Sequence, residues 1–119
     1  MSETTEMMFY IIDDEREVAE TVRDGLELGL KCECFLFSSV DECLVQLDKK
    51  LPQIILSDVH MPTGSGLRII EELKNRKVQV PTIFITGVMD KTPKEENVIM
   101  IRKPVNFKNL ISLIQKELR

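Results

Sequence analysis

The chain has 119 residues, 43% of them hydrophobic, and a formal net charge of −4 at pH 7. This size and composition suit one domain with its own core, while the acidic balance argues against broad nucleic-acid binding, which requires a basic face. No apolar run approaches the roughly 20 residues that cross a bilayer, and we expect no secretory signal at the start of the sequence.

Strands and helices are predicted to alternate after a start at residues 1–5 that we expect to be mobile. Short apolar runs rich in β-branched and aromatic residues predict five strands. These runs are Met7–Ile12, Cys32–Phe37, Ile54–Leu56, Thr82–Thr86 and Val98–Ile101. Apolar residues at helical spacing predict a helix after the first, second, third and fifth strands. Their stripes are Val18, Val22 and Leu26; Val40, Leu44 and Leu47; Leu67, Ile70 and Leu73; and Leu110, Leu113, Ile114 and Leu118.

Local signals mark where these helices begin and end. Gly29 is a plausible stop for the first helix, and Ser39 and Glu42 have capping-box spacing at the start of the second. The third helix is predicted to end near Asn75, and Asn106 can cap the last one. Alternating helices and near-continuous apolar strands indicate a parallel sheet covered on both faces, a doubly wound α/β sandwich.

Five functional groups stand at or just after the carboxyl ends of four predicted strands. They are Asp13, Asp14, Asp58, Thr86 and Lys103. In doubly wound sheets, ligands bind beyond this edge, at the point where the strand order reverses. We therefore expect these groups to converge on one site.

The convergence of Asp13, Asp14 and Asp58 would bring three negative charges together, which costs energy unless a cation lies between them. Mg²⁺ is the natural partner because it prefers oxygen ligands. Lys103 adds a positive charge and Thr86 adds a hydroxyl. A carboxylate nucleophile, Mg²⁺, a lysine and a hydroxyl are the groups needed to transfer a phosphoryl group to an aspartate.

In this order, the residues resemble the receiver domain of two-component response regulators over essentially the whole chain. The matching motifs are Asp13-Asp14, the segment Asp58–Gly66, Thr86-Gly87 and Lys103-Pro104. The resemblance implies a flavodoxin-like five-stranded parallel sheet in the order 2-1-3-4-5. It also implies a phosphorylation-controlled signalling switch rather than a turnover enzyme.

The resemblance further implies how the acidic residues act. Asp58 would accept a phosphoryl group from a histidine kinase or a phosphotransfer protein. Mg²⁺ would be held by the side chains of Asp14 and Asp58, by Asp13 mainly through water, and by the backbone carbonyl of His60.

Two further residues take roles from the same resemblance. Lys103 would hold the phosphoryl oxygens, and the Lys103–Pro104 peptide bond would be cis. Thr86 would move toward the phosphoryl group as the switch.

The sequence departs from the family in two places. Met100 stands where family members usually carry the Tyr or Phe that rotates during switching. The connection between the fourth and fifth strands, Gly87–Asn97, is shorter than usual by more than a helical turn of ~4 residues. We therefore predict that the helix after the fourth strand is shortened to a stub near Thr92–Glu95 or missing, and that the chain is a monomer or a non-standard dimer.

Three other functions share parts of this pattern. A receiver-fold interaction module with degraded switching stays open because of Met100 and the short connection. An aspartate-nucleophile phosphohydrolase would place a second acid two residues after Asp58, where His60 stands. A flavodoxin-like cofactor carrier would meet repulsion between its phosphate and residues 13–15.

The three cysteines indicate the compartment. Cys32, Cys34 and Cys43 are few and odd in number, so we expect small core residues in a reducing compartment and a cytoplasmic location. We assign residues 1–119 to one receiver domain without an output domain, since the last helix runs to Arg119. Its expected partners are a kinase or phosphotransfer protein and an unknown protein target, with no nucleic acid or membrane.

Overall fold

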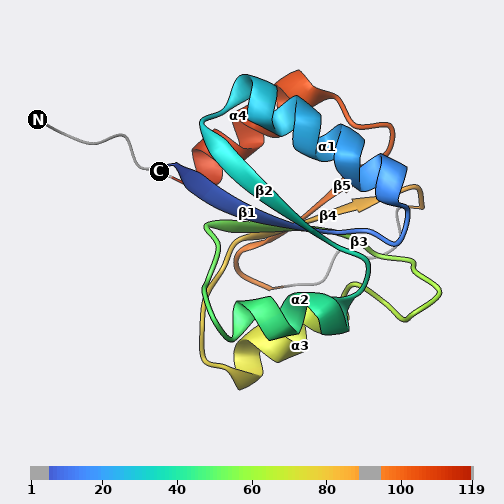
Figure 1. Cartoon of the computed structure of the whole chain (residues 1–119), viewed down its shortest axis with the longest axis vertical. Coiled ribbons are helices and arrows are strands. Elements are labelled where there is room, and N and C mark those ends of the chain that lie inside the picture. The colour runs from blue at the N-terminus through green and yellow to red at the C-terminus, as the bar shows by residue number, and fades with distance from the viewer. Residues whose placement is uncertain (1–5, 89–94, 119) are drawn as a thin grey trace, which may run out of the picture.

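The computed structural model describes residues 6–88 and 95–118. Strands and helices alternate within them as predicted (Figure 1). The strands are β1 (Met7–Ile12), β2 (Cys32–Phe37), β3 (Ile54–Asp58), β4 (Thr82–Thr86) and β5 (Val98–Arg102). The helices are α1 (Arg16–Gly29), α2 (Val40–Leu47), α3 (Arg68–Asn75) and α4 (Phe107–Glu117). The predicted mobile start at residues 1–5 lies outside the described residues.

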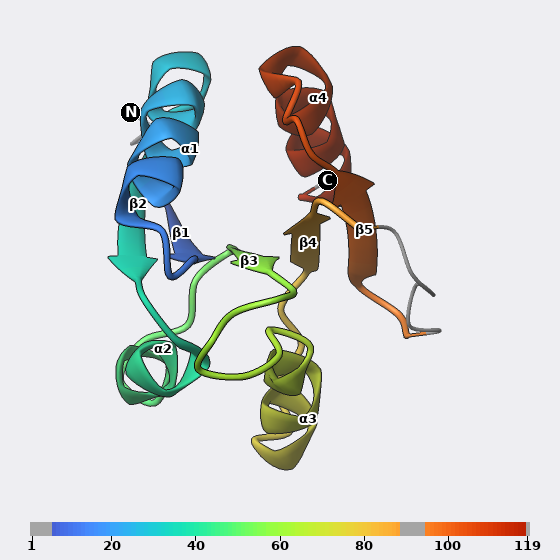
Figure 2. The same cartoon turned by 90° about the vertical axis from the view of Figure 1, so that its right-hand side faces the viewer.

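The five strands form one parallel sheet in the order β2-β1-β3-β4-β5, which confirms the predicted fold class. Helices α1 and α4 cover one face, and α2 and α3 cover the other (Figure 2). The chain order of the strands reverses between β1 and β3, so the carboxyl ends of these two strands flank the point where doubly wound folds bind ligands.

The core has two parts, one on each face of the sheet. Alternate residues of β1 point to opposite faces: Phe9 and Ile11 pack beneath α1 and α4, whereas Tyr10 and Ile12 pack against α2 and α3. All residues of β3 and β4 are buried, as strands covered on both faces should be. The central strands are therefore firmly held, and so are the residues at their ends.

The three cysteines are buried and unpaired, as predicted. Burial raises the pKa of the Cys43 thiol to about 12 and also raises the pKa values of Cys32 and Cys34. A thiol that stays protonated is a poor nucleophile. These residues therefore serve as packing groups.

The predicted caps are present, with one difference. Ser39 Oγ accepts a hydrogen bond from Glu42 N (3.1 Å), and Asn106 Oδ1 accepts one from Asn109 N (3.1 Å). The Glu42 carboxylate, however, accepts from the hydroxyl and backbone N–H of Ser38 (2.5 and 3.3 Å). The return hydrogen bond of the capping box thus comes from Ser38 and not from Ser39, the residue that the sequence pattern predicts.

The inner face of α3 also differs from the prediction. Ile69 and Leu73 are its buried residues, whereas Leu67 and Ile70 are only partly buried. The helix begins at Arg68, so the i, i+4 pair that faces the sheet is Ile69 and Leu73 rather than the predicted stripe.

The connection between β4 and β5 is short, as the fold prediction requires. Its described residues, 87–88 and 95–97, contain no helix. The predicted stub helix near Thr92–Glu95 falls largely on residues 89–94, which lie outside the described part of the chain. On the α2 and α3 face of β5, Val98 and Met100 are only partly buried.

An acidic side chain of α1 reaches the edge strand β2. The Glu27 carboxylate accepts a hydrogen bond from the backbone N–H of Cys34 (2.9 Å). Within residues 6–88 and 95–118, no helix has the length and apolar character that crossing a membrane requires.

Two glycines set how closely α1 approaches α4. A Cβ atom on Gly25 would lie 2.3 Å from a ring carbon of Phe107, and one on Gly29 would lie 2.3 Å from the terminal methyl of Ile111. We expect Gly25→Ala to lower the free energy of unfolding by about 2 kcal/mol, because the whole Phe107 ring must shift. Urea unfolding measures this change.

Gly29→Ala is the matched control for Gly25→Ala. The Ile111 methyl sits at the end of a flexible side chain and can rotate away, and alanine favours a helix over glycine by up to about 1 kcal/mol. We therefore expect Gly29→Ala to keep the parent stability within about 1 kcal/mol. Equal losses for the two variants would contradict this account of the α1 and α4 contact.

Candidate functional site

Three carboxylates meet at the carboxyl edge of the sheet. Asp58 is the last residue of β3, and Asp13 and Asp14 follow β1 directly. One carboxylate oxygen from each lies within 4.8 Å of the other two. Asp13 and Asp58 are only 6% and 8% exposed. The structure thus brings together the three acids that the sequence places at neighbouring strand ends.

The electrostatics of this cluster fit a divalent cation. Burial raises the pKa of Asp13, and the negative charges of Asp58 and Asp14 raise it further. A hydrogen bond from Glu15 N to Asp13 Oδ1 (2.9 Å) and the charge of Lys103 lower this pKa in part. Carboxylate oxygens held this close suit a hard cation such as Mg²⁺ or Ca²⁺.

The raised pKa of Asp13 leads to a stability prediction. An acid whose pKa is higher in the folded than in the unfolded state destabilises the fold when ionised, and this cost disappears as the pH falls through the folded-state pKa. Asparagine resembles the neutral acid. At neutral pH without metal, we expect Asp13→Asn to raise the free energy of unfolding by about 1 kcal/mol.

Thermal unfolding of the parent and of Asp13→Asn, with and without Mg²⁺, checks this prediction. The variant should gain less stability from Mg²⁺, because one acidic group of the cluster is gone. It should also gain less than the parent when the pH is lowered. A variant that is less stable than the parent without metal would show that the Asp13 charge is not a net cost.

Lys103 supplies the positive charge of the site. Its Nζ lies 3.4 Å from Asp58 Oδ2. Its backbone N–H donates to the carbonyl of Thr86 (2.8 Å), which ties the residue to the end of β4. The Lys103–Pro104 peptide bond is cis, as the resemblance implies.

Thr86 reaches the same edge but faces its own loop. Its hydroxyl donates to the Val88 carbonyl (3.0 Å) and accepts from Val88 N–H (3.2 Å). The residue is fully buried. Four of the five predicted groups form the charged cluster. The fifth, the Thr86 hydroxyl, is instead hydrogen-bonded to the backbone of Val88.

The loop after Asp58 packs tightly on the backbone of Asp58. Gly66 N–H donates to the Val59 carbonyl (2.8 Å), and a Cβ on Gly66 would lie 1.9 Å from the Asp58 carbonyl oxygen. Ser57 Oγ donates to the same carbonyl (2.8 Å). The sequence identifies Gly66 only as a loop glycine, and nothing in the local pattern reveals its contact with Asp58. His60 is exposed in this loop.

Met100 lies at the site predicted for it in β5. It pairs in register with Phe84 of β4. Its side chain is partly buried and packs against the core between the sheet and the α2 and α3 layer. The position taken by a rotating aromatic in most of the family is thus filled by a flexible thioether.

A doubly wound parallel sheet with clustered carboxylates and a lysine at its carboxyl edge defines a class of signalling domain, the receiver. The sequence profile of the response regulator receiver domain matches residues 9–115. The chain therefore belongs to this family.

Similar proteins agree with this assignment. The chain is 32% identical over 118 residues to the response regulator protein TodT of Pseudomonas putida, a match that covers 94% of this chain and 51% of TodT. It is also 32% identical over 81 residues to the DNA-binding transcriptional regulator NtrC of Klebsiella pneumoniae, covering 68% of this chain and 17% of NtrC. The chain thus spans about half the length of TodT.

Solved structures show the same fold. A CheY-like receiver domain from Methylobacillus flagellatus superposes with a TM-score of 0.84 at 19% identity, covering 95% of this chain and 99% of the other. The chemotaxis protein CheY4 of Vibrio cholerae gives a TM-score of 0.82 at 20% identity, covering 96% and 100%.

Proposed function

We propose that this receiver domain is a phosphorylation-controlled switch in which Asp58 accepts the phosphoryl group. The observation that carries the proposal is the position of Asp58, buried at the end of β3 beside two further acids and 3.4 Å from Lys103 Nζ. A carboxylate oxygen of Asp58 attacks phosphorus while the phosphorus–nitrogen bond of a phosphohistidine breaks, leaving an acyl phosphate and a free imidazole.

The donor in this proposal is a histidine kinase or a phosphotransfer protein. Asp13, Asp14, Asp58 and the backbone carbonyl of His60 would hold Mg²⁺, which when bound supplies positive charge beside the phosphoryl oxygens. Lys103 stabilises the same oxygens from the side of β5.

Thr86 supplies the switching contact. To reach a phosphoryl group on Asp58, its hydroxyl must leave the Val88 carbonyl, which it now contacts at 3.0 Å. The loop at Gly87 and Val88 loses a hydrogen bond in that step. Phosphorylation of Asp58 would thereby change the conformation of the residues that follow β4.

The chain acts as a signalling domain that transfers and loses one phosphoryl group, without turnover of a separate substrate. We assign it to the cytoplasm because its three thiols are buried and unpaired. Its output is contact with a protein target. We expect a monomer, or a dimer that does not use the usual family face, because the connection after β4 is short.

A second function is favoured by one observation. Met100 replaces the rotating aromatic, so the chain could serve as an interaction module whose surface responds weakly to phosphorylation. Binding of beryllofluoride, a phosphoryl mimic, without structural change beyond the Asp58 loop would support this alternative.

The deciding experiment follows amide NMR signals while beryllofluoride and Mg²⁺ are added together. We expect saturable changes around Asp58, Thr86 and Lys103 in the parent chain, none in Asp58→Ala, and a parent-like response in the control Asp24→Ala, whose exposed carboxylate lies on α1. A parent chain without any response would overturn the proposed function.

The same samples test the oligomeric state. Light scattering should give the same mass before and after beryllofluoride is added, since the described residues of the short connection, 87–88 and 95–97, offer no regular helix. A dimer that forms only with the mimic, through β5 and α4, would contradict this prediction.

A further inference from the structure

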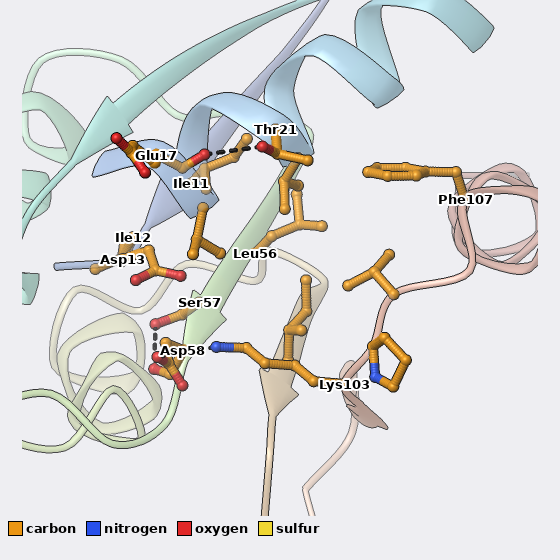
Figure 3. Close-up of a pocket in the computed structure, with 15 residues that line it drawn as sticks. Ile11, Ile12, Asp13, Glu17, Thr21, Leu56, Ser57, Asp58, Lys103 and Phe107 are labelled. Carbon is orange, nitrogen blue, oxygen red and sulfur yellow. Dashed lines mark hydrogen bonds and ion pairs between the residues drawn. The ribbon is translucent and has the colours of Figure 1, made fainter. Parts of the chain in front are cut away.

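A largely apolar cavity lies beside the acceptor site, between α1 and the segment that joins β5 to α4 (Figure 3). Its volume is about 700 Å³, and sites for small molecules typically measure about 300–1,000 Å³. Leu56 and Ile85 of the sheet form its base, Val18 and Val22 of α1 form one wall, and Val105 lies on the other side. The cavity therefore has the size and surface of a site for a small organic molecule.

The packing of α1 on α4 explains why this space is open. At one end, the Phe107 ring rests against Gly25, which brings the two elements together. Nearer the acceptor site, the facing residues are short: Thr21 on α1 and Val105 in the segment before α4. These side chains do not bridge the gap. The cavity thus reaches from Phe107 at one end to Asp58 at the other.

The two ends of the cavity differ in chemistry. Phe107 marks the apolar end in Figure 3, whereas Asp13, Asp58 and Lys103 lie together at the other end. Glu17 of α1 also lines this end, with its carboxylate turned outward in Figure 3. Two carboxylates and one ammonium group leave this end with a net negative charge, so it attracts positive charge.

We infer that this cavity binds a small organic cation with an apolar body, such as an aryl or alkyl amine or amidine. The apolar body would lie on Leu56, Ile85 and Val105, and the cationic head would contact the carboxylate of Asp13. The site rests on the cavity and its charge distribution, so it does not depend on phosphoryl transfer to Asp58.

Three probes of one shape and different charge test this inference. Naphthylmethylamine, naphthylmethanol and naphthoic acid are titrated into the metal-free chain while NMR signals of Val18, Thr21 and Val105 are followed. We expect saturable shifts with the amine at a Kd of about 1 mM, and roughly tenfold weaker binding of the alcohol and the acid. No saturation with the amine, or equal affinity for all three probes, would overturn the inference.

Two pairs of variants locate the site. Val18→Trp fills the cavity and should abolish amine binding, whereas Val45→Trp places the same side chain on the exposed side of α2 and should leave it unchanged. Glu17→Lys should weaken binding of the amine and strengthen binding of the acid. Glu20→Lys lies on the same helix but away from the cavity lining, so it should change neither affinity by more than about twofold. Thermal unfolding confirms that each variant is folded. Full amine binding by Val18→Trp would also overturn the inference.

Discussion

Lys103→Met is expected to slow phosphorylation of Asp58 by acetyl phosphate by about 100-fold or more, the cost of removing one preorganised donor of positive charge from a transition state. Methionine keeps much of the length and apolar stem of lysine but has no charge. In the structure, Lys103 Nζ lies 3.4 Å from Asp58 Oδ2, the carboxylate proposed to accept the phosphoryl group. Phosphorylated and free protein are separated and quantified over time to obtain the rate.

The matched control is Lys108→Met. Lys108 lies on the exposed surface of α4 and its loss should leave the rate unchanged. Circular dichroism shows whether both variants stay folded. A Lys103→Met chain that is phosphorylated within about threefold of the parent rate, a difference below 1 kcal/mol, would remove Lys103 from the proposed chemistry.

Gly66→Ala should cause the largest loss of stability of any alanine substitution in the acceptor loop. The new Cβ would lie 1.9 Å from the Asp58 carbonyl oxygen, which belongs to the backbone and cannot rotate away. The loop must move, and the hydrogen bond from Gly66 N–H to the Val59 carbonyl is strained or lost. We expect a loss of about 3 kcal/mol in the free energy of unfolding.

The same displacement should affect the proposed chemistry, because the carbonyl that collides belongs to Asp58, the proposed acceptor. Gly66→Ala should therefore lose the beryllofluoride response even at temperatures where the chain is folded. Gly87→Ala is the control: no described atom outside its chain neighbours lies within 4 Å of its Cβ position, so we expect near-parent stability. Parent-like stability and response in Gly66→Ala would show that the loop adapts without moving Asp58.

The fold could be predicted from sequence because its strands are apolar runs bounded by polar residues. Met7–Ile12 and Thr82–Thr86 match the predicted strands residue for residue. Parallel strands with helical crossovers then bring their carboxyl ends to one edge. For this reason the sequence alone predicts that Asp13, Asp58 and Lys103, which are far apart in the chain, lie together.

What the sequence did not reveal depends on contacts between distant residues. The Gly66 contact with the Asp58 carbonyl needs the exact path of the loop, and the cavity beside α1 needs the distance at which Phe107 rests on Gly25. The Thr86 hydroxyl could form a hydrogen bond with a group beside Asp58 or with the backbone of its own loop. The residue type alone does not show which of these two partners it has. Local patterns fix which elements form, whereas packing decides what their side chains touch.

The hydrogen bond from the Cys34 amide to Glu27 has a consequence for how α1 can change during evolution. An unpaired backbone N–H on an edge strand can form a hydrogen bond with a strand of another molecule, which leads to aggregation. A carboxylate that already accepts from this N–H reduces that risk. The first turns of α1 line the cavity beside the acceptor, while its last turns protect this edge. Mutations in α1 that alter the cavity must therefore preserve the contact of Glu27 with β2, so the same helix carries both the cavity wall and the protection of the sheet edge.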